Sequence, residues 1–210
     1  MGIWERQVVP RVIDKLLGNE QMAQVRSRSL GGLHGTVVEI GFGSGPNVPL
    51  YPDAVTHVYA VDPSVVGRRL ADPRLAASPV PVEFVGLDGQ HLPLPDASVD
   101  CALSTWTLCT IPDVAAALAE LRRVLVPDGE LFFLEHGLSP SPRVETWQHR
   151  LEPIQKRLGG GCHLSRDIPE LIAAAGFEID NLAEFDIAGP KVASHMFSGV
   201  GRSPAVARPA

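Results

Sequence analysis

Residues 36–47, TVVEIGFGSGPN, combine an apolar run that ends at a carboxylate with three alternating glycines. The apolar part predicts a buried strand, and the glycines at 41, 43 and 45 predict a tight loop directly after it. Glycine tolerates positive φ angles and lets a ligand approach the backbone closely. In a sheet of parallel strands, ligands bind at the loop where a strand turns into its helix, because the helix offers free backbone N–H groups. The stretch therefore predicts an α/β fold with a ligand at this loop.

The rest of the chain alternates between β-rich runs and helical patterns. Such alternation is typical of a parallel sheet with helices on both faces. Two final runs, 177–185 and 194–202, are predicted to close the sheet, the second one antiparallel. The fold class is therefore α/β, a Rossmann-like, doubly wound, seven-stranded sheet that is mostly parallel. The other expected strands are 36–40, 57–61, 82–85, 99–104 and 130–135, and the expected helices are 64–70, 114–126, 143–158 and 168–175.

Two helical patterns precede the sheet. Apolar residues from Trp4 to Leu17 recur at helical spacing, and Pro10 marks either a kink or a late start of this helix. A second, more polar helix is predicted over 19–30 and ends at a pair of glycines. Charges of mixed sign favour a lid, or packing against the core, over a helix on a membrane surface. We expect residues 1–33 to form an N-terminal helical lid, 34–202 the main domain and 203–210 a flexible tail.

The composition is that of an ordinary globular protein and argues against some partners. Of the 210 residues, 45% are hydrophobic and 20% are charged, and the formal net charge is -6. This charge argues against nucleic acid and anionic lipid, so a small-molecule partner is expected. No apolar run reaches the roughly 18 residues that span a bilayer, and the first residues lack a signal-peptide pattern. We therefore expect a cytoplasmic protein with no integral membrane segment; the sequence does not fix its oligomeric state.

Two carboxylates near the glycine loop indicate which ligand it binds. Asp62 ends the second predicted strand, where its carboxylate can accept hydrogen bonds from the two hydroxyls of a ribose. A dinucleotide-binding loop reads GxGxxG, whereas the third glycine here, Gly45, comes one residue early. Glu39, before the first glycine, would repel a pyrophosphate but suits an ammonium group. These features favour S-adenosylmethionine, which carries an ammonium and a sulfonium and no phosphate.

Four motifs extend this pattern: EIGFGSG, VDPS, LDGQHLPLPDASVD and LRRVLVPDGELFFLEHG. Over residues 36–136 they resemble the class I S-adenosylmethionine-dependent methyltransferases of the type 11 kind, which implies S-adenosylmethionine as cofactor and S-adenosylhomocysteine as product. The resemblance further implies that Glu39 holds the methionine amino group, Asp62 the ribose and Asp88 the adenine amine. Beside Asp88, Gln90 also serves the adenine, although it replaces the commoner acid. The other residues that the resemblance places at the cofactor are Gly41, Gly43, Gly45, Asn47, Pro63, Ser64, Gly89, Ser104 and Thr105.

A narrower resemblance concerns the methyl acceptor. SVDCALSTWTLCTIPD, FLEHG, ETWQHRLEPI and GCHLSRDI are similar to the branch of methyltransferase-like alkyl thiol S-methyltransferases and their uncharacterised bacterial relatives. This likeness implies a small, fairly apolar acceptor: a thiol or sulfide first, with a quinone or phenol and a lipid amine as alternatives. A thiol is also the least demanding acceptor, because it is already a few per cent thiolate near neutral pH. The membrane-bound animal members carry an apolar N-terminal anchor that we do not expect here.

The acceptor pocket is expected at the ends of the fourth and fifth strands, where STWTLCT and FLEHG stand. His136 is the leading candidate for a base, with Glu135 beside it to orient the ring, and His163 is the second. Either histidine can instead cap a turn or bond a carbonyl group. The side chains expected to line the pocket are Trp106, Leu108, Cys109, Trp147 and Arg166.

Simpler roles compete for some of these pocket residues. For Cys109, the role of a small, buried hydrophobic side chain is favoured over a role in the chemistry. Trp147 fits ordinary helix packing. Arg166 fits an anchor for an acidic group, or an ion pair with Glu135 or Asp167.

The cysteines indicate neither a disulfide framework nor a metal site. Cys101, Cys109 and Cys162 are odd in number and lack CxxC spacing. A cluster of His136, Cys162 and His163 would offer metal ligands, but no ligand-pair spacing supports it. The sequence therefore predicts no metal.

Two functions of a different class stay open. An NAD(P)-dependent oxidoreductase is disfavoured by the early third glycine. The chain also has only two tyrosines, Tyr51 and Tyr59, and neither forms a convincing catalytic pair with a lysine. A non-catalytic module that keeps the cofactor pocket is disfavoured by the complete set of Glu39, Asp62 and Asp88. Binding of S-adenosylmethionine but not of NAD separates the methyltransferase from the oxidoreductase.

Overall fold

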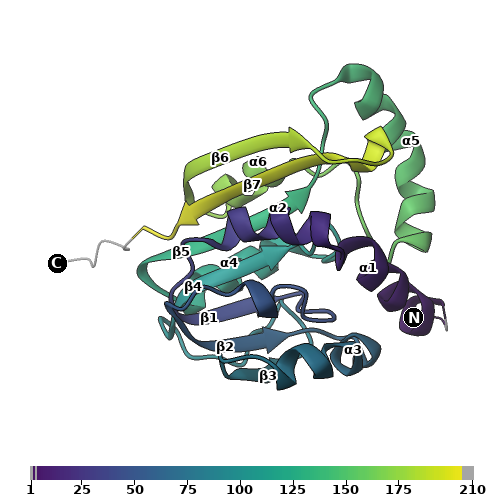
Figure 1. Cartoon of the computed structure of the whole chain (residues 1–210). Coiled ribbons are helices and arrows are strands. Elements are labelled where there is room, and N and C mark those ends of the chain that lie inside the picture. Colours follow the sequence, from purple (N-terminus) through teal and green to yellow (C-terminus); the bar gives the residue numbers. More distant parts are fainter. Residues whose placement is uncertain (1, 3, 205–210) are drawn as a thin grey trace.

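The computed structural model describes residue 2 and residues 4–204, so most of the expected tail lies outside the described residues. Its strands are β1 (Gly35–Ile40), β2 (Val55–Val61), β3 (Val82–Gly86), β4 (Val99–Thr105), β5 (Leu125–His136), β6 (Glu178–Asp186) and β7 (His195–Arg202). They form one sheet in the order β3-β2-β1-β4-β5-β7-β6 (Figure 1). Neighbouring strands run parallel from β3 to β5, whereas β7 is antiparallel to both β5 and β6. The predicted fold class is confirmed, including the antiparallel closing strand.

Helices cover both faces of the sheet. The helical elements are η1 (Trp4–Val8), α1 (Val9–Leu17), α2 (Glu20–Leu30), η2 (Val48–Leu50), α3 (Val65–Ala76), α4 (Val114–Val124), α5 (Pro142–Leu158), α6 (Ile168–Ala174) and η3 (Lys191–Ala193). On one face, Leu118 and Leu121 of α4 and Ile172 of α6 pack with Phe133 of β5. On the other, Leu30 of α2 joins a second buried cluster that includes residues of β1, β2 and β4. The buried apolar runs of the sequence are thus explained by a sheet covered on both sides.

Local sequence signals explain where the helices begin and end. The side chains of Ser64, Asp113 and Asp167 accept a hydrogen bond from a backbone N–H of the first turn of α3, α4 and α6. The helix expected over 114–126 ends earlier, at Val124, and the chain continues directly into β5. Pro127 explains this difference, because the residue before a proline avoids helical geometry.

The N-terminal helices bridge two distant parts of the fold. Helical structure begins at Trp4, in the π-helical turn η1, and Pro10 lies in the first turn of α1, which follows it directly. The indole N–H of Trp4 donates to the carbonyl oxygen of Leu158 at the end of α5, at 3.1 Å. Asp14 of α1 pairs with Arg74 of α3, also at 3.1 Å. Helix α1 therefore lies between α3 and α5 (Figure 1).

Within the described part of the chain, none of the helices combines the length and the apolar composition that crossing a bilayer would require.

Candidate active site

The glycine loop follows β1 at the carboxyl end of the sheet. Gly41 and Gly43 have φ angles of 69° and 57°, a region that residues with side chains rarely adopt. A Cβ atom at Gly41 would also overlap the side chain of Thr107. At Gly43, a Cβ atom would meet a single atom within 4 Å, the carbonyl oxygen of Gly41 at 3.8 Å. Packing within the chain thus requires the first glycine, whereas the backbone at the second is open to a ligand.

Asp62, after the last residue of β2, ties this loop to the start of α3. Its carboxylate accepts hydrogen bonds from the backbone N–H of Gly43 at 2.7 Å and of Ser64 at 2.6 Å. Burial raises the pKa of the Asp62 carboxyl, and these two hydrogen bonds oppose that effect. Each carboxylate oxygen keeps a second lone pair, so Asp62 can still accept hydrogen bonds from a ligand beside the loop.

Glu39, near the carboxyl end of β1, is a buried carboxylate. Its oxygens accept hydrogen bonds from the side-chain amide of Asn47, at 2.9 Å, and from the hydroxyl of Tyr51. Burial raises the pKa of Glu39 to about 7, although both hydrogen bonds act in the opposite direction. Water screens a carboxylate poorly in such a place, so the site favours a cationic partner.

Arg26, on α2, reaches the same place from the N-terminal helices. Its guanidinium is 2% exposed and donates to Asn47 Oδ1 at 2.8 Å and Thr105 Oγ1 at 2.7 Å. It also lies 4.5 Å from the ring centroid of Trp106. Burial lowers the pKa of Arg26 to about 10, against the attraction of Glu39. A buried cation and a buried carboxylate thus stand on either side of Asn47, an arrangement that complements a ligand carrying both an ammonium and a carboxylate.

Asp88 and Gln90 lie on an exposed loop after β3. Asp88 Oδ1 accepts hydrogen bonds from the backbone N–H and the side-chain amide of Gln90, at 2.9 and 2.8 Å. These bonds lower the pKa of the Asp88 carboxyl. Gln90 Oε1 in turn accepts from the backbone N–H of Asp113, which caps α4. The pair is held in place by its own contacts and remains open to solvent.

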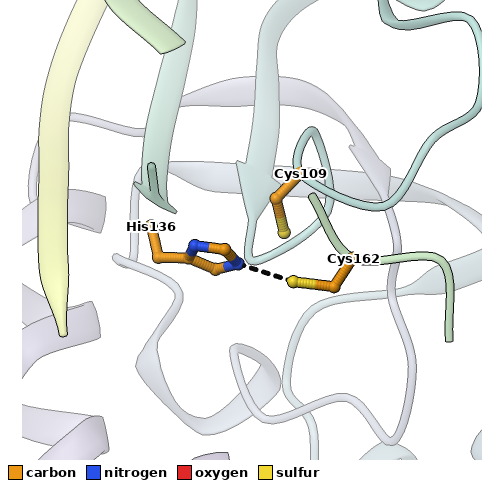
Figure 2. Close-up of side chains that lie close together, drawn as sticks. All are labelled: Cys109, His136 and Cys162. Atoms are coloured by element: carbon orange, nitrogen blue, oxygen red, sulfur yellow. Dashed lines mark hydrogen bonds between the residues drawn. The ribbon is translucent and has the colours of Figure 1, made fainter. Parts of the chain in front are cut away.

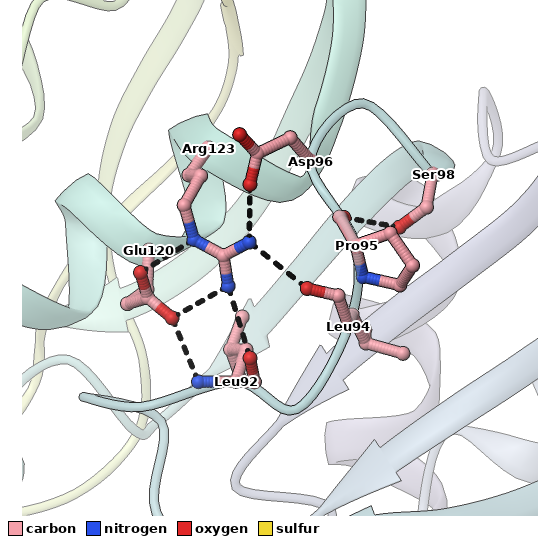
Figure 3. Close-up of polar contacts among 7 residues, drawn as sticks. All are labelled: Leu92, Leu94, Pro95, Asp96, Ser98, Glu120 and Arg123. Carbon is pink, nitrogen blue, oxygen red and sulfur yellow. Dashed lines mark hydrogen bonds and ion pairs between the residues drawn. The ribbon is translucent and has the colours of Figure 1, made fainter.

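Arg123 of α4 holds the continuation of this loop (Figure 3). Its guanidinium donates to Glu120, to Asp96 and to the carbonyl oxygens of Leu92 and Leu94, at 2.7 to 2.9 Å. These five hydrogen bonds use all five N–H donors of the side chain. The bonds from Arg123 lower the pKa of Glu120 to about 2. The segment between β3 and β4, which carries Asp88, is therefore anchored to α4.

Glu135, near the end of β5, holds the loop after β4. Its Oε1 accepts hydrogen bonds from the Ser104 hydroxyl at 2.7 Å and from the backbone N–H groups of Thr107 and Leu108 at 2.9 and 3.1 Å. The expectation that Glu135 orients the ring of His136 is therefore wrong. Adjacent residues of a strand point to opposite faces, so the carboxylate and the imidazole have separate partners.

His136 instead meets two cysteines (Figure 2). Its Nε2 lies 2.9 Å from Cys162 Sγ, and Cys109 Sγ completes a group whose ligand atoms all lie within 4.8 Å of one another. The hydrogen bond from Cys109, with support from His136, lowers the pKa of Cys162 against the effect of burial. Burial alone would lower the pKa of His136, but the contact with Cys162 outweighs it and raises this pKa. Cys109 is buried in a small apolar cluster with Leu164, as expected, and its thiol also lies close to Cys162 and His136.

Two cavities lie near these elements. One of about 110 Å³ lies between the turn that joins α1 to α2 and the segment after the glycine loop, and Arg26 and Pro46 line it. A larger groove of about 460 Å³ lies between α2 and the strands β6 and β7. Residues such as Ser29 and Leu182 line this groove, and none of the predicted site residues does. The predicted site residues therefore lie away from the larger groove.

Comparisons with known proteins agree with this geometry. Residues 38–133 match the family model described as a methyltransferase domain. The chain is 35% identical over 146 residues to the thiol S-methyltransferase TMT1B of Rattus norvegicus. This alignment covers 68% of this chain and 59% of the rat protein. The chain belongs to the class I S-adenosylmethionine-dependent methyltransferases. S-adenosylmethionine is accordingly the cofactor of its family.

Other methyltransferases are similar over different lengths. The ubiquinone/menaquinone biosynthesis C-methyltransferase UbiE of Cellvibrio japonicus is 35% identical over 98 residues, or 44% of this chain and 38% of that protein. A crystal structure of a SAM-dependent methyltransferase from Thermotoga maritima, a possible histamine N-methyltransferase, has a TM-score of 0.67 and 22% identity over 96% of this chain and 98% of that one. This structural likeness shows the fold. The chain spans about three fifths of the length of the rat relative, at 59%.

The methyltransferase fold brings most of the predicted cofactor residues together. Glu39, Asn47 and Thr105 are joined by side-chain hydrogen bonds at the ends of β1 and β4. Asp62 lies against the glycine loop. Asp88 is more exposed and lies on the loop after β3. The remaining predicted residues lie in these same loops and strand ends: Gly45, Pro63, Ser64, Gly89 and Ser104.

Three residues predicted for the acceptor side have other surroundings in this methyltransferase. Trp147 is 48% exposed, and Arg150 lies over its ring, with its guanidinium carbon 5.5 Å from the ring centroid. Arg166 donates to the carbonyl oxygens of Leu108 and Pro112 and so braces the loop after β4, whereas an ion pair with an acid was one expectation. The ring of His163 lies 3.4 Å from Glu152, outside the group formed by the two cysteines and His136.

Sequence reasoning missed two residues that lie beside Glu39 and Asn47, namely Arg26 and Tyr51. Arg26 lies in a helix that reads as polar, where a charged side chain normally points to solvent. Its spacing was the available signal, because Met22, Arg26 and Leu30 recur every four residues and form the buried stripe of α2. Tyr51 has no convincing catalytic partner in the sequence, and in the structure it hydrogen-bonds to Glu39. That pairing depends on the turn after the glycine loop, which local sequence does not reveal.

Proposed function

We propose that this chain transfers the methyl group of S-adenosylmethionine to the sulfur atom of a small, fairly apolar thiol. Binding of S-adenosylmethionine is supported by one observation above all. Glu39 and Arg26 form a buried pair of opposite charges on either side of Asn47. The thiol is supported by the 35% identity to a rat protein named as a thiol S-methyltransferase.

Each part of the cofactor has a matching group in this proposal. The Glu39 carboxylate receives the ammonium of the methionine moiety, and the Arg26 guanidinium receives its carboxylate. Charge-assisted hydrogen bonds of this kind are shorter and stronger than neutral ones. Asp62 accepts from the ribose hydroxyls, and the open backbone at Gly43 lies against the nucleoside. Asp88 and Gln90 take the adenine at the solvent-exposed edge.

We assign residues 1–33 the role of a lid over this pocket. Arg26 belongs to α2, so part of the cofactor site is contributed by the N-terminal helices. Trp4 and Asp14 attach these helices to α5 and α3. The cavity of about 110 Å³ beneath the turn from α1 to α2 is lined by Arg26 but not by Glu39 or Asp62. In this proposal, cofactor binding requires Arg26 to exchange its bonds with Asn47 and Thr105 for bonds to the ligand.

The chemistry demands little beyond alignment. The thiol sulfur attacks the methyl carbon as the bond from that carbon to the sulfonium breaks, leaving neutral S-adenosylhomocysteine, a thioether and one proton. Holding the reacting atoms about 3 to 3.5 Å apart and in line contributes roughly 7 to 11 kcal/mol. His136 is not adopted as the free base expected from the sequence, because its Nε2 already faces Cys162.

The test begins with calorimetric titration of the purified chain with S-adenosylmethionine, S-adenosylhomocysteine and NAD. Binding of the first two and not of NAD is expected. Mass spectrometry then follows methyl transfer from labelled S-adenosylmethionine to matched acceptors: an alkyl thiol, a phenol, a quinol and an amine. S-methylation of the thiol alone is the expected result. Transfer to the quinol alone would replace the thiol by the quinone alternative, which the UbiE match favours.

A further inference from the structure

We propose that Cys109, His136 and Cys162 form a zinc site with an open fourth position, and that this position takes the thiolate of the methyl acceptor. The proposal rests on the thiol methyltransferase function proposed above. It departs from the sequence-based expectation that the chain has no metal site, because the structure assembles the ligands from three separate segments.

The three residues converge from elements that are far apart in the sequence. Cys109 lies on the loop after β4, His136 ends β5, and Cys162 follows α5 (Figure 2). All three are buried, with exposed fractions of 1%, 6% and 7%. Their ligand atoms lie within 4.8 Å of one another. Such a meeting of two thiols and an imidazole in a dry place is the ligand set that zinc prefers.

The distances suit a tetrahedral ion after a small adjustment. Zinc binds sulfur at about 2.3 Å and imidazole nitrogen at about 2.1 Å, which places ligand atoms about 3.5 to 3.8 Å apart. The contact of 2.9 Å between His136 Nε2 and Cys162 Sγ is a hydrogen bond in the metal-free chain. It must lengthen by about 0.6 Å to admit the ion. Rotation of the side chains supplies a change of this size.

The number of ligands indicates a reactive site instead of a structural one. Among the described residues, no further histidine, cysteine or carboxylate belongs to this group. Structural zinc sites are closed by four protein ligands, whereas catalytic sites keep three and leave the fourth position for water or substrate. A Cys₂His set with an open position is one of the known catalytic arrangements.

An unpaired atom of the cluster also indicates a missing polar group. His136 Nδ1 is buried and has no hydrogen-bond partner among the residues that the structure describes. Buried polar atoms are normally paired, and a ligating histidine normally donates its second nitrogen to a carboxylate, carbonyl or water. Ordered water or a bound acceptor next to the cluster would satisfy this atom.

The cluster lies on the acceptor side of the cofactor pocket. Cys109 shares the loop after β4 with Trp106, whose ring lies 4.5 Å from the Arg26 guanidinium carbon. Arg166 braces the same loop through the carbonyl oxygen of Leu108. One short loop therefore connects the proposed methionine site with the proposed metal site.

The reaction balances without any oxidant. The thiol loses its proton to solvent as its sulfur binds zinc, and the ion lowers the thiol pKa as it does for other ligands. A lone pair of the bound sulfur then forms the new bond to the methyl carbon. The bond between that carbon and the sulfonium breaks, and its electron pair stays on S-adenosylhomocysteine. The thioether product is neutral and a weaker ligand, so it leaves the zinc, whose oxidation state does not change.

The first test is metal binding by the reduced, chelator-treated chain. Titration with Zn²⁺ against a chromogenic chelator, followed by elemental analysis, should give one zinc per chain. Cys109→Ser and Cys162→Ser should each weaken zinc binding at least tenfold. His149→Gln is the control, because His149 is an exposed histidine of α5 outside the groups of potential metal ligands, and this variant should bind zinc like the wild type.

Two measurements on the wild-type chain do not depend on how the variants fold. Co²⁺ should give the intense near-ultraviolet absorption of thiolate ligands. One equivalent of Zn²⁺ should slow alkylation of Cys109 and Cys162, measured by mass spectrometry. A reduced wild-type chain that retains no zinc, or alkylation of Cys109 and Cys162 at the same rate with and without Zn²⁺, would overturn the site.

The acceptor role is tested separately from the methyltransferase function. Zinc-free chain should bind S-adenosylmethionine normally but methylate an alkyl thiol at least tenfold more slowly, with recovery on adding Zn²⁺. Full thiol methylation without zinc would overturn the zinc proposal and leave the proposed function standing. Zinc binding without thiol methylation by the loaded chain would overturn both the acceptor position and the proposed thiol substrate.

Discussion

Replacing Glu39 by glutamine should make the cofactor-free chain more stable at alkaline pH while weakening cofactor binding. Burial raises the pKa of Glu39 from 4.5 to about 7 in the folded chain. The folded state therefore holds its proton more tightly than the unfolded state does. Stability from this group is fully present below pH 4.5 and is lost as the pH rises through about 7. This difference in pKa corresponds to about 3 kcal/mol, most of which falls between pH 5 and pH 8.

Urea unfolding of wild type and Glu39→Gln at pH 5, 6, 7 and 8 measures this effect. Glutamine can keep neutral hydrogen bonds to Asn47 and Tyr51 but cannot ionise. The free energy of unfolding of the variant relative to that of the wild type should therefore rise by about 2 to 3 kcal/mol from pH 5 to pH 8. Glu178→Gln, at an exposed carboxylate, is the control and should show no such rise. If the difference in unfolding free energy between Glu39→Gln and wild type did not change with pH, the reasoning that this carboxyl is buried at a high energetic cost would be refuted.

The same variant should bind S-adenosylmethionine less tightly. Loss of a charge-assisted hydrogen bond to the ammonium costs roughly 1.5 to 3 kcal/mol, or about ten- to 150-fold in Kd. Calorimetry at pH 8 compares the two proteins where wild-type Glu39 is ionised. A stabilised variant with unchanged cofactor affinity would separate the two claims, supporting the burial and removing Glu39 from the cofactor site.

Three further variants test other parts of the site. Arg26→Gln should weaken S-adenosylmethionine binding about tenfold or more but leave binding of methylthioadenosine, which lacks the amino acid part, nearly unchanged in calorimetry. Arg123→Gln should lower the free energy of unfolding by about 1 to 3 kcal/mol in urea, because it removes donors from Glu120 and from two loop carbonyls; a loss below about 0.5 kcal/mol would contradict the anchoring role. Trp147→Ala should leave kcat/KM for the thiol within about twofold of wild type, because its exposed ring lies on the outer face of α5, and a tenfold loss would return Trp147 to the acceptor pocket.

The fold was predictable because its signals are local and repeated. Alternation of apolar runs with helical patterns indicates parallel strands wherever both faces are covered, and the structure confirms the resulting seven-stranded sheet. The end of α4 was placed two residues too late, because the apolar run continues from the helix into β5 without a polar break. Pro127 was the local signal that should have ended the helix.

The site was predictable only where it follows a strand end. Glu39, Asp62 and the glycines stand at such ends, so the sequence positions them once the sheet is known. Arg26 reaches the pocket from a helix outside the sheet. The group of Cys109, His136 and Cys162 depends on two loops and a strand end that meet in space. The sequence suggested His136 and Cys162 as possible ligands but paired them with His163, and their spacing gave no sign of Cys109. Residues brought together by long-range packing are thus the ones that single-sequence reasoning cannot find.

Thr107 touches both halves of the catalytic centre. Its side chain fills the space that forces glycine at position 41, and its backbone N–H donates to Glu135 at 2.9 Å. It therefore acts as a spacer between the loop that carries the methyl donor and the strand end that faces the acceptor. A change in the size of this one side chain, which contacts neither substrate in our proposal, would alter the KM for both together.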